Sequence, residues 1–303
     1  YYTGFKVNSG EYKLMGLAPY GEPRYANLIK EKLINFSDDG SFQLDMSYFD
    51  YTTGLTMTNK KFNKLFGGPP RTSETELTKR EMDLAASVQK VIEDIVLKLA
   101  KNIAKETGER NLCLAGGVAL NCVANGILLR EKIFDKIWIQ PAAGDAGGSL
   151  GAALSTWYLH YNNERTLSKK RDAMKGAYLG PEFSDDEIEA ELKVCGAVYK
   201  KFSEMELIKE VAVTIANGKA VGWMQGRMEF GPRALGGRSI IADPRLPNMQ
   251  KQLNIKVKYR ESFRPFAPSI LREDVGEWFD CETDSPYMIL VADVQNDKRR
   301  TLT

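Results

Sequence analysis

The side chains best suited to chemistry lie between Gly226 and Ser269, where cations alternate with glycine, proline and apolar residues. From Arg227 to Arg264 the sequence holds nine lysines or arginines and only three acids, a local balance of +6. The whole chain is +2, so everything outside this window sums to −4. A concentrated positive charge in an otherwise slightly acidic chain predicts an anionic ligand. The glycines and prolines favour a small ligand held by shaped loops over a polymer lying on a face.

Two arginines in this window, Arg233 and Arg238, flank the turn in GPRALGGRS. Pro232, Gly236 and Gly237 can fix unusual backbone geometry there. An arginine fork binds phosphate or carboxylate through two parallel hydrogen bonds, which lysine cannot do. The alternative is a solvated basic face, which the intervening glycine, proline and apolar residues disfavour. Further cations follow at Lys256, Lys258, Arg260 and Arg264.

Two glycine-rich turns form a second group of candidates, LAGGVALN (Leu114–Asn121) and AGDAGGSLGAAL (Ala143–Leu154). A glycine pair between a strand and a helix lets a phosphate approach backbone N–H groups at the helix amino end. The alternative for the first turn is tight strand–helix packing alone. In the second turn Asp145 could hold a metal ion, or could merely cap the helix. Because the two units are about 30 residues apart, a βαβ-scale separation, both turns are expected at one end of a sheet.

Absent motifs exclude several classes of function. His160 is the only histidine, so neither a Ser-His-Asp triad nor a multi-histidine metal site is present in this sequence. There is no P-loop. The four cysteines form no CxxC pair, which is typical of a reducing cytoplasm. No apolar run is long enough to span a bilayer. We therefore expect a cytoplasmic protein without a membrane anchor.

Hydrophobic periodicity predicts the elements that position these residues. Helices are expected over 81–105, 118–130, 184–194 and 205–217, and another runs from the second glycine-rich turn to about 161. Strands are expected over 111–115, 136–140, 176–179 and 220–224. Residues 10–23 are expected to form a loop, 162–175 a linker, and 287–294 a strand-like run. Alternating strands and helices with glycine-rich turns predict an α/β protein. The break at 162–175 divides it into domains over 1–165 and 176–303.

Five segments, in this order, resemble the NodU/CmcH family of O-carbamoyltransferases. They are GEYKLMGLAPYG, LCLAGGVALNCVANG, QPAAGDAGGSLGAAL, GRMEFGPRALGGRSIIADPR and YRESFRPFAPSIL. The resemblance covers nearly the whole chain, from about Tyr2. It implies the C-terminal lobe of an actin/sugar-kinase-like domain over 1–165, followed by a YrdC-like α/β domain over 176–303. Family members are longer and this sequence has no initiator Met, so we expect an internal fragment of a larger protein, possessing only part of each domain.

The resemblance also implies a reaction. Such enzymes take carbamoyl phosphate and ATP, form carbamoyl-AMP with release of pyrophosphate, and pass the carbamoyl group to a hydroxyl of a small-molecule or sugar acceptor. It assigns the adenylate-forming step to the cationic window and the transfer step to the domain around Asp145. By position it implies phosphate binding by Arg233, Arg238, Lys258 and Arg264, a nucleotide-binding turn with Gly116, Gly117, Asn121 and Gly144, and a divalent metal of the iron or magnesium type at Asp145. Other metal ligands are expected in an HxxxH motif upstream.

Two other functions remain open at this point. A tRNA threonylcarbamoylation-type enzyme would share both kinds of domain. A nucleotide- or nucleic-acid-binding module without catalysis would use the same cations. The nearly neutral overall charge, and aromatic residues that do not alternate with the basic ones, disfavour nucleic acid. The acceptor hydroxyl and the oligomeric state stay open.

Overall fold

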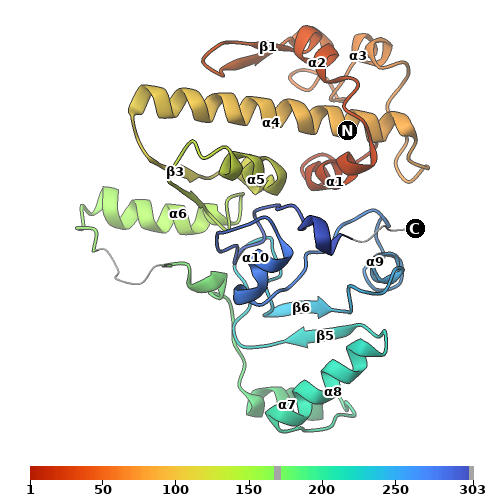
Figure 1. Cartoon of the computed structure of the whole chain (residues 1–303), viewed down its shortest axis with the longest axis vertical. Helices are drawn as coiled ribbons and strands as arrows, with labels where there is room; N and C mark the ends of the chain where they lie inside the picture. Colours follow the sequence, from red (N-terminus) through yellow and green to blue (C-terminus); the bar gives the residue numbers. More distant parts are fainter. Residues whose placement is uncertain (167–171, 300–303) are drawn as a thin grey trace. The chain divides into compact units, whose positions relative to one another are not determined.

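The chain forms two compact units in the computed structural model, which describes residues 1–166 and 172–299. Unit 1 comprises Tyr1–Leu112, Val123–Trp138 and Glu261–Pro265, and unit 2 comprises Cys113–Cys122, Ile139–Arg260 and Phe266–Thr303. Helices and small two-stranded sheets confirm the predicted α/β class (Figure 1). The predicted pair of actin/sugar-kinase-like and YrdC-like domains over 1–165 and 176–303 stays a prediction.

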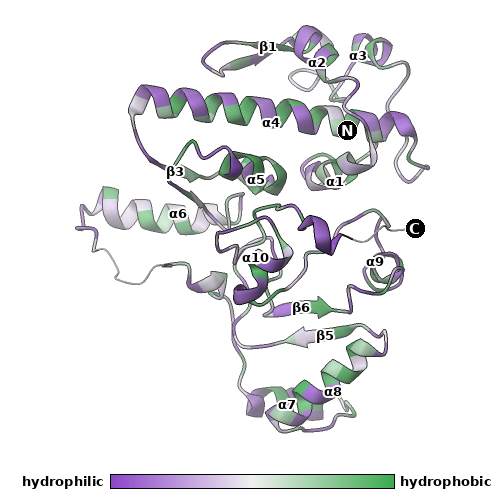
Figure 2. Ribbon diagram, in the orientation of Figure 1, coloured by the Kyte–Doolittle hydropathy of each residue, from purple (hydrophilic) through white to green (hydrophobic). Residues whose placement is uncertain are grey.

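Unit 1 is mainly helical and is built on one long helix, α4 (Lys79–Thr107). A capping box between Thr78 and Glu81 begins α4, and Gly108 ends it with a left-handed φ of 69°. Polar and apolar residues alternate along α4 with a helical period (Figure 2), which confirms the helix predicted over 81–105. The preceding elements are α1 (Glu11–Leu17), η1 (Ala18–Tyr20), α2 (Ala26–Lys32), β1 (Ile34–Phe36), β2 (Phe42–Leu44), η2 (Met46–Tyr48) and α3 (Lys60–Leu65).

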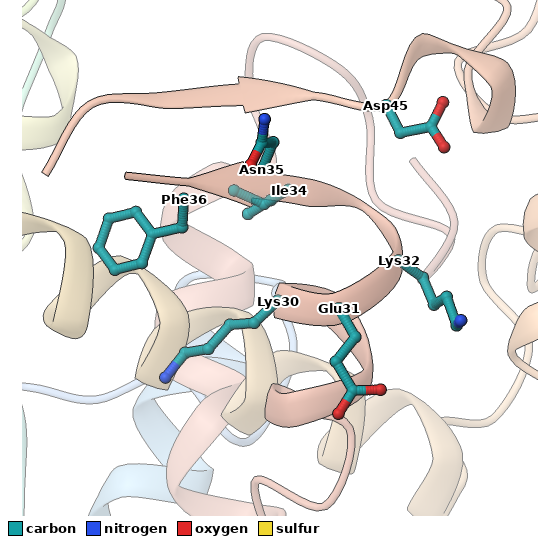
Figure 3. Close-up of a pocket in the computed structure, with 7 residues that line it drawn as sticks. All are labelled: Lys30, Glu31, Lys32, Ile34, Asn35, Phe36 and Asp45. Carbon is teal, nitrogen blue, oxygen red and sulfur yellow. The ribbon is translucent and has the colours of Figure 1, made fainter. Parts of the chain in front are cut away.

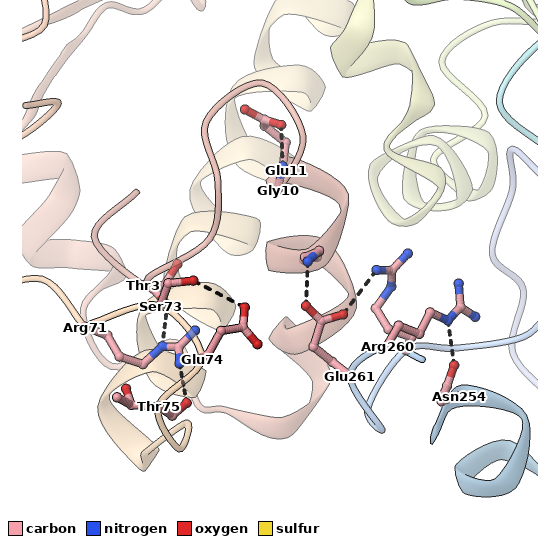
Figure 4. Close-up of polar contacts among 12 residues, drawn as sticks. Thr3, Gly10, Glu11, Arg71, Ser73, Glu74, Thr75, Asn254, Arg260 and Glu261 are labelled. Carbon is pink, nitrogen blue, oxygen red and sulfur yellow. Dashed lines mark hydrogen bonds and ion pairs between the residues drawn. The ribbon is translucent and has the colours of Figure 1, made fainter. Parts of the chain in front are cut away.

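Helices α1 and α2 pack against α4 and bury the core of unit 1. In one cluster Leu17 is buried with Phe5, Ala18 and Ala85. The loop predicted over 10–23 is therefore wrong, because packing on α4 stabilises a short helix that its glycines and proline conceal. Polar contacts also hold the segments that flank these helices. The Arg71 guanidinium donates to the carbonyls of Thr3 and Thr75 (Figure 4).

The first glycine turn follows β3 (Asn111–Leu114), and the second follows β4 (Lys136–Ile139). These strands pair with each other. Asp135 N–H donates to the Arg110 carbonyl and Gln140 N–H to the Leu114 carbonyl, so the two strands run parallel. Between them lie η3 (Gly117–Leu120) and α5 (Cys122–Arg130). The predicted continuous helix over 118–130 is thus interrupted at Asn121.

The other elements of unit 2 are α6 (Gly147–Ser155), the π-helical turn η4 (Thr156–His160), η5 (Lys175–Ala177), α7 (Asp185–Val194), α8 (Glu204–Ala216), β5 (Val221–Met224), β6 (Arg238–Ile241), α9 (Met249–Gln252), the π-helical turn η6 (Leu253–Val257), η7 (Arg272–Asp274), α10 (Val275–Trp278) and η8 (Asn296–Lys298). Strands β5 and β6 are antiparallel, with Val221 opposite Ile241 and Met224 opposite Arg238. Ser184 caps α7, as its sequence predicts. None of the helices in the described residues is both long and apolar enough to cross a membrane.

Two predicted strands of unit 2 are wrong. Residues 176–179 form a turn instead, because Lys175, Gly176 and Ala177 all have positive φ. The run 287–294 contributes a single bridge, between Val294 and Phe279, and is otherwise irregular. The predicted linker over 162–175 is described in part, since residues 167–171 lie outside the described residues.

The burial of Leu17 in the core of unit 1 predicts that Leu17→Ala strongly destabilises the protein. The Leu17 side chain is 1% exposed, so its truncation leaves a cavity and should lower the free energy of unfolding by about 3 kcal/mol. Leu55, which is fully exposed, provides the control, and Leu55→Ala should change stability by less than about 0.5 kcal/mol. Urea unfolding followed by circular dichroism measures both. Equal effects from the two variants would contradict the packing of α1 on α4.

Candidate functional site

The two glycine turns meet at one end of the β3–β4 pair. Gly116 N–H donates to the Ala143 carbonyl at 2.8 Å. A Cβ on Gly144 would lie 3.7 Å from Cδ1 of Leu120, the last residue of η3. Gly116, Gly117, Asn121, Gly144 and Asp145 therefore belong to adjacent loops of unit 2, which confirms the expectation that both turns lie at one end of a sheet.

Close strand–helix packing does not explain the first glycine pair. Gly116 has a left-handed φ of 96°, a backbone conformation that favours glycine. A Cβ at Gly116 or Gly117 would meet no atom of the described residues within 4 Å. Asn121 follows them immediately before α5, and its N–H donates to the Val118 carbonyl. The turn thus leaves open space beside its backbone, as a ligand-binding turn requires.

Asp145 precedes α6 but does not cap it. The residue at the cap position is Ala146, and no side chain of the described residues accepts a hydrogen bond there. The Asp145 side chain is exposed. Within residues 1–166 and 172–299, no group of three or more histidine, cysteine or acidic side chains is arranged to hold a metal ion. Asp145 could supply one carboxylate oxygen ligand, so the metal stays a prediction that needs other ligands.

The GPRALGG segment lies on these two turns. Arg233 Nη2 donates to the carbonyl oxygen of Leu120 at 3.3 Å. A Cβ on Gly231, whose φ is 128°, would lie 3.4 Å from the Pro141 carbonyl oxygen and 3.5 Å from Ala142 Cα. The structure thus brings together three loops of unit 2 that are far apart in the sequence. We refer to residues 229–238 as the arginine loop.

The buried carboxylate of Glu229 organises the arginine loop. Its Oε1 accepts backbone N–H groups from Leu235 at 2.6 Å, Gly237 at 2.8 Å and Arg238 at 3.3 Å. Burial alone would raise the pKa of Glu229, but these hydrogen bonds outweigh it and the pKa is lowered. The Tyr178 hydroxyl donates to the Leu235 carbonyl. Burial raises the pKa of Tyr178, and the Glu229 carboxylate raises it further.

Arg233 and Arg238 each keep a buried, unpaired donor. Arg238 Nη1 donates to the carbonyls of Gly237 at 2.7 Å, Gly226 at 3.1 Å and Gln225 at 3.3 Å. Its Nη2 is buried and has no acceptor among the described residues, and the same is true of Arg233 Nε. A buried unsatisfied donor costs about 1–3 kcal/mol, and more when charged. An anionic ligand would satisfy both guanidinium groups.

The other two predicted cations, Lys258 and Arg264, are not part of the arginine loop. Lys258 is exposed directly after η6, and its N–H donates to the Leu253 carbonyl. Arg264 belongs to unit 1, where its side chain is only 13% exposed. It lies 3.5 Å from the Glu261 carboxylate and over the Tyr12 ring. The structure therefore groups Arg233 with Arg238, but places neither Lys258 nor Arg264 in the arginine loop.

Other cations of the window are engaged by neighbours. Arg245 makes a two-pronged ion pair with Asp243, whose pKa the arginine lowers to about 2. Arg260 donates to the Asn254 side chain at 2.7 Å (Figure 4) and lies over the Phe266 ring. The ion pair of Arg245 reduces the charge available to a ligand, whereas the neutral partners of Arg260 leave its charge intact.

One pocket of unit 1 is lined by other side chains. It has a volume of about 550 Å³ and is lined in unit 1 by Lys30, Glu31, Lys32, Ile34, Asn35, Phe36 and Asp45 (Figure 3). Its charged side chains do not point toward a common centre, and Lys30 is paired with Asp94 at 2.5 Å. A smaller pocket of about 320 Å³ lies along α9 and η6. We place the candidate site at the glycine turns because open backbone lies there and Arg233, whose Nε has no acceptor among the described residues, contacts Leu120.

Comparisons with known proteins identify the family. Residues 1–154 match the family model of the carbamoyltransferase N-terminus, and residues 212–303 match that of the carbamoyltransferase C-terminus. The chain therefore belongs to the carbamoyltransferase family, as its resemblance predicts.

Named relatives agree with this assignment. The chain is 62% identical over its whole length to an uncharacterized protein of Synechocystis sp.. Over 96% of its length it is 41% identical to nodulation protein NolNO of Sinorhizobium fredii and 39% identical to nodulation protein NolO of Bradyrhizobium diazoefficiens. It covers 49%, 41% and 51% of these three proteins, so it spans about half the length of the relatives it matches.

Sequence reasoning missed Glu229 and Tyr178, which hold the arginine loop. For Glu229 a signal exists, because it is the only acid between Arg227 and Asp243 and is followed by a glycine-rich turn. An acid in such a place can accept the N–H groups that the turn exposes. For Tyr178 there is no local signal, because its partner Leu235 is 57 residues away.

The lowered pKa of Glu229 predicts that its contribution to stability depends on pH. Glu229→Gln keeps an oxygen acceptor but removes the charge, so at pH 7 the free energy of unfolding should fall by about 1–2 kcal/mol. A carboxyl whose folded pKa is below its unfolded value stabilises above the unfolded pKa. The difference from wild type should therefore shrink below about pH 4.5, the ordinary value, as the pH falls through the folded pKa.

Exposed Glu210 in α8 provides a matched control. Glu210→Gln should change stability by less than about 0.5 kcal/mol. Urea unfolding between pH 3.5 and 8 measures the differences. A difference between wild type and Glu229→Gln that stays constant over this range would contradict a charge-dependent role.

Proposed function

We propose that this protein is an O-carbamoyltransferase that uses carbamoyl phosphate and ATP. Water is consumed as carbamoyl phosphate loses inorganic phosphate, and the carbamoyl unit joins the α-phosphate of ATP as pyrophosphate leaves. The hydroxyl oxygen of a small-molecule or sugar acceptor then bonds to the carbamoyl carbon and AMP leaves. The observation that carries this proposal is membership of the carbamoyltransferase family, by matches to both its N- and C-terminal models.

The arginine loop supports phosphate chemistry in particular. Preorganised cationic donors stabilise the charge that develops during adenylate formation, and this step needs no histidine base. Arg233 Nε and Arg238 Nη2 are buried donors without acceptors in the described residues, which suits phosphoryl oxygens. We assign phosphate binding to these two residues and, in the complete enzyme, to Lys258 and Arg264 as well.

The glycine turns suit the nucleotide and the transfer step. We assign Gly116, Gly117, Asn121 and Gly144 to the nucleotide-binding turn, supported by the open space beside Gly116 and Gly117. Asp145 would contribute a ligand to a divalent metal, which would polarise the carbamoyl carbonyl or the acceptor oxygen. For the complete protein we propose an actin/sugar-kinase-like domain and a YrdC-like domain.

Pyrophosphate exchange provides the test of this function. The full-length protein should incorporate labelled pyrophosphate into ATP only when carbamoyl phosphate is present. Arg233→Ala should reduce this exchange by about 10²-fold or more, the usual loss for one preorganised donor. Arg245→Ala is the matched control, because Arg245 lies in the same window but is paired with Asp243, and it should stay within about twofold of wild type. Absence of exchange would refute the proposal, and threonine-dependent ATP turnover would instead support threonylcarbamoylation.

Salt dependence separates a small-anion site from a nucleic-acid surface. If the window is a small-anion site, tRNA or single-stranded DNA should bind only weakly at 150 mM salt, and the affinity should vary little with salt. A surface that neutralises several phosphates would instead lose affinity steeply as salt increases. Fluorescence anisotropy with labelled oligonucleotides between 50 and 300 mM salt distinguishes these outcomes.

A further inference from the structure

A strained segment of unit 2 lies beside the arginine loop. Lys175, Gly176 and Ala177 are consecutive and have φ values of 52°, 71° and 65°. Left-handed backbone is unfavourable for lysine and alanine, whose Cβ crowds the following carbonyl. Such a conformation persists only where its surroundings fix it, and it occurs often near functional sites. Groups outside the segment must therefore hold it in this conformation.

Asp172 and Tyr287 hold the strained segment. Asp172 Oδ1 accepts the Met174 N–H at 2.9 Å, and Oδ2 accepts the Gly176 N–H at 2.9 Å. The Tyr287 hydroxyl also donates to Oδ2 of Asp172, and Tyr287 is only 4% exposed. Burial would raise the pKa of Asp172, but the hydrogen bonds from Tyr287, Gly176 and Met174 together lower it. The carboxylate is therefore charged at neutral pH and makes charge-assisted hydrogen bonds.

The strained segment in turn supports the arginine loop near both ends. Phe230 N–H donates to the Ala177 carbonyl at 2.6 Å, three residues before Arg233. The Tyr178 hydroxyl donates to the Leu235 carbonyl, two residues after Arg233. Both contacts come from adjacent residues, Ala177 and Tyr178. The backbone conformation of the strained segment therefore determines where Phe230 and Leu235 lie.

We propose that Asp172 and Tyr287 are positioning residues for Arg233 and Arg238. By fixing the left-handed segment, they hold the arginine loop so that its two unpaired guanidinium atoms can bind one phosphoryl-containing anion. This inference rests on the proposed function only for the identity of that anion. Neither residue touches the ligand, and both act through Ala177 and Tyr178.

The test combines anion binding with arginine labelling in the full-length protein. Inorganic pyrophosphate is the probe for calorimetric titration. Phenylglyoxal modification of Arg233 and Arg238, mapped by mass spectrometry, is expressed relative to exposed Arg245. In wild type, pyrophosphate should protect Arg233 and Arg238. In Tyr287→Phe the pyrophosphate dissociation constant and the relative labelling of both arginines should each increase about tenfold, as expected for loss of one charge-assisted hydrogen bond.

Tyr2→Phe is the matched control. Tyr2 is similarly buried, at 6% exposure, and its hydroxyl donates to the Gly68 carbonyl in unit 1. Tyr2→Phe should leave pyrophosphate binding and arginine labelling unchanged, even where this substitution lowers the melting temperature. Asp172→Ala should weaken pyrophosphate binding more than Tyr287→Phe does. Asp172→Asn should weaken it less than Asp172→Ala does. If Asp172→Ala does not fold, Tyr287→Phe alone tests the inference.

The outcomes separate this inference from the proposed function. The inference is overturned if Tyr287→Phe binds pyrophosphate and is labelled as wild type is, while its melting temperature falls as in Tyr2→Phe. That result would mean a purely structural role for Tyr287. Arginines that pyrophosphate fails to protect in wild type would overturn it too. Pyrophosphate could protect the arginines in wild type and fail to do so in Tyr287→Phe, while the protein shows no carbamoyl-phosphate-dependent exchange. This result would support the inference and refute carbamoyl transfer.

Discussion

The candidate site depends on one buried carboxylate, that of Glu229. Its Oε1 accepts the N–H groups of Leu235, Gly237 and Arg238, and so closes the arginine loop on itself. A run of exposed N–H groups in such a turn is commonly an anion-binding nest. Here the protein supplies the anion, so these three N–H groups are already satisfied. A ligand anion is therefore expected at the guanidinium groups, which the loop backbone orients.

Ion pairing distinguishes two other arginines of the window from Arg233 and Arg238. Arg245 is neutralised by Asp243, and Arg264 lies beside Glu261 in unit 1. An ion pair of this kind lowers the electrostatic field that a ligand experiences. Arg233 and Arg238 instead donate to carbonyl oxygens, which keep the full charge of each guanidinium. Carbonyl partners therefore hold these two arginines in place and leave their charge available.

Local signals predicted most of the elements and little of their assembly. The apolar period of α4, the Ser184 cap of α7 and the glycine turns after β3 and β4 are all encoded within short stretches. Helix α1 was missed because packing on α4 stabilises it. Residues 176–179 were predicted as a strand. The prediction failed because the positive φ values in this segment involve Asp172 and distant Tyr287, which no local signal reveals. Similarly, Arg233 and Leu120 are 113 residues apart, and no pattern in one sequence relates them.

The contact between Arg233 and Leu120 joins regions that sequence reasoning assigned to separate steps. Leu120 lies within the match to the carbamoyltransferase N-terminus, and Arg233 lies within the match to the C-terminus. One guanidinium thus holds the glycine turn through Nη2 while its Nε has no acceptor among the described residues. The two matched regions therefore meet within unit 2 through one guanidinium, whose charge the Leu120 carbonyl leaves intact.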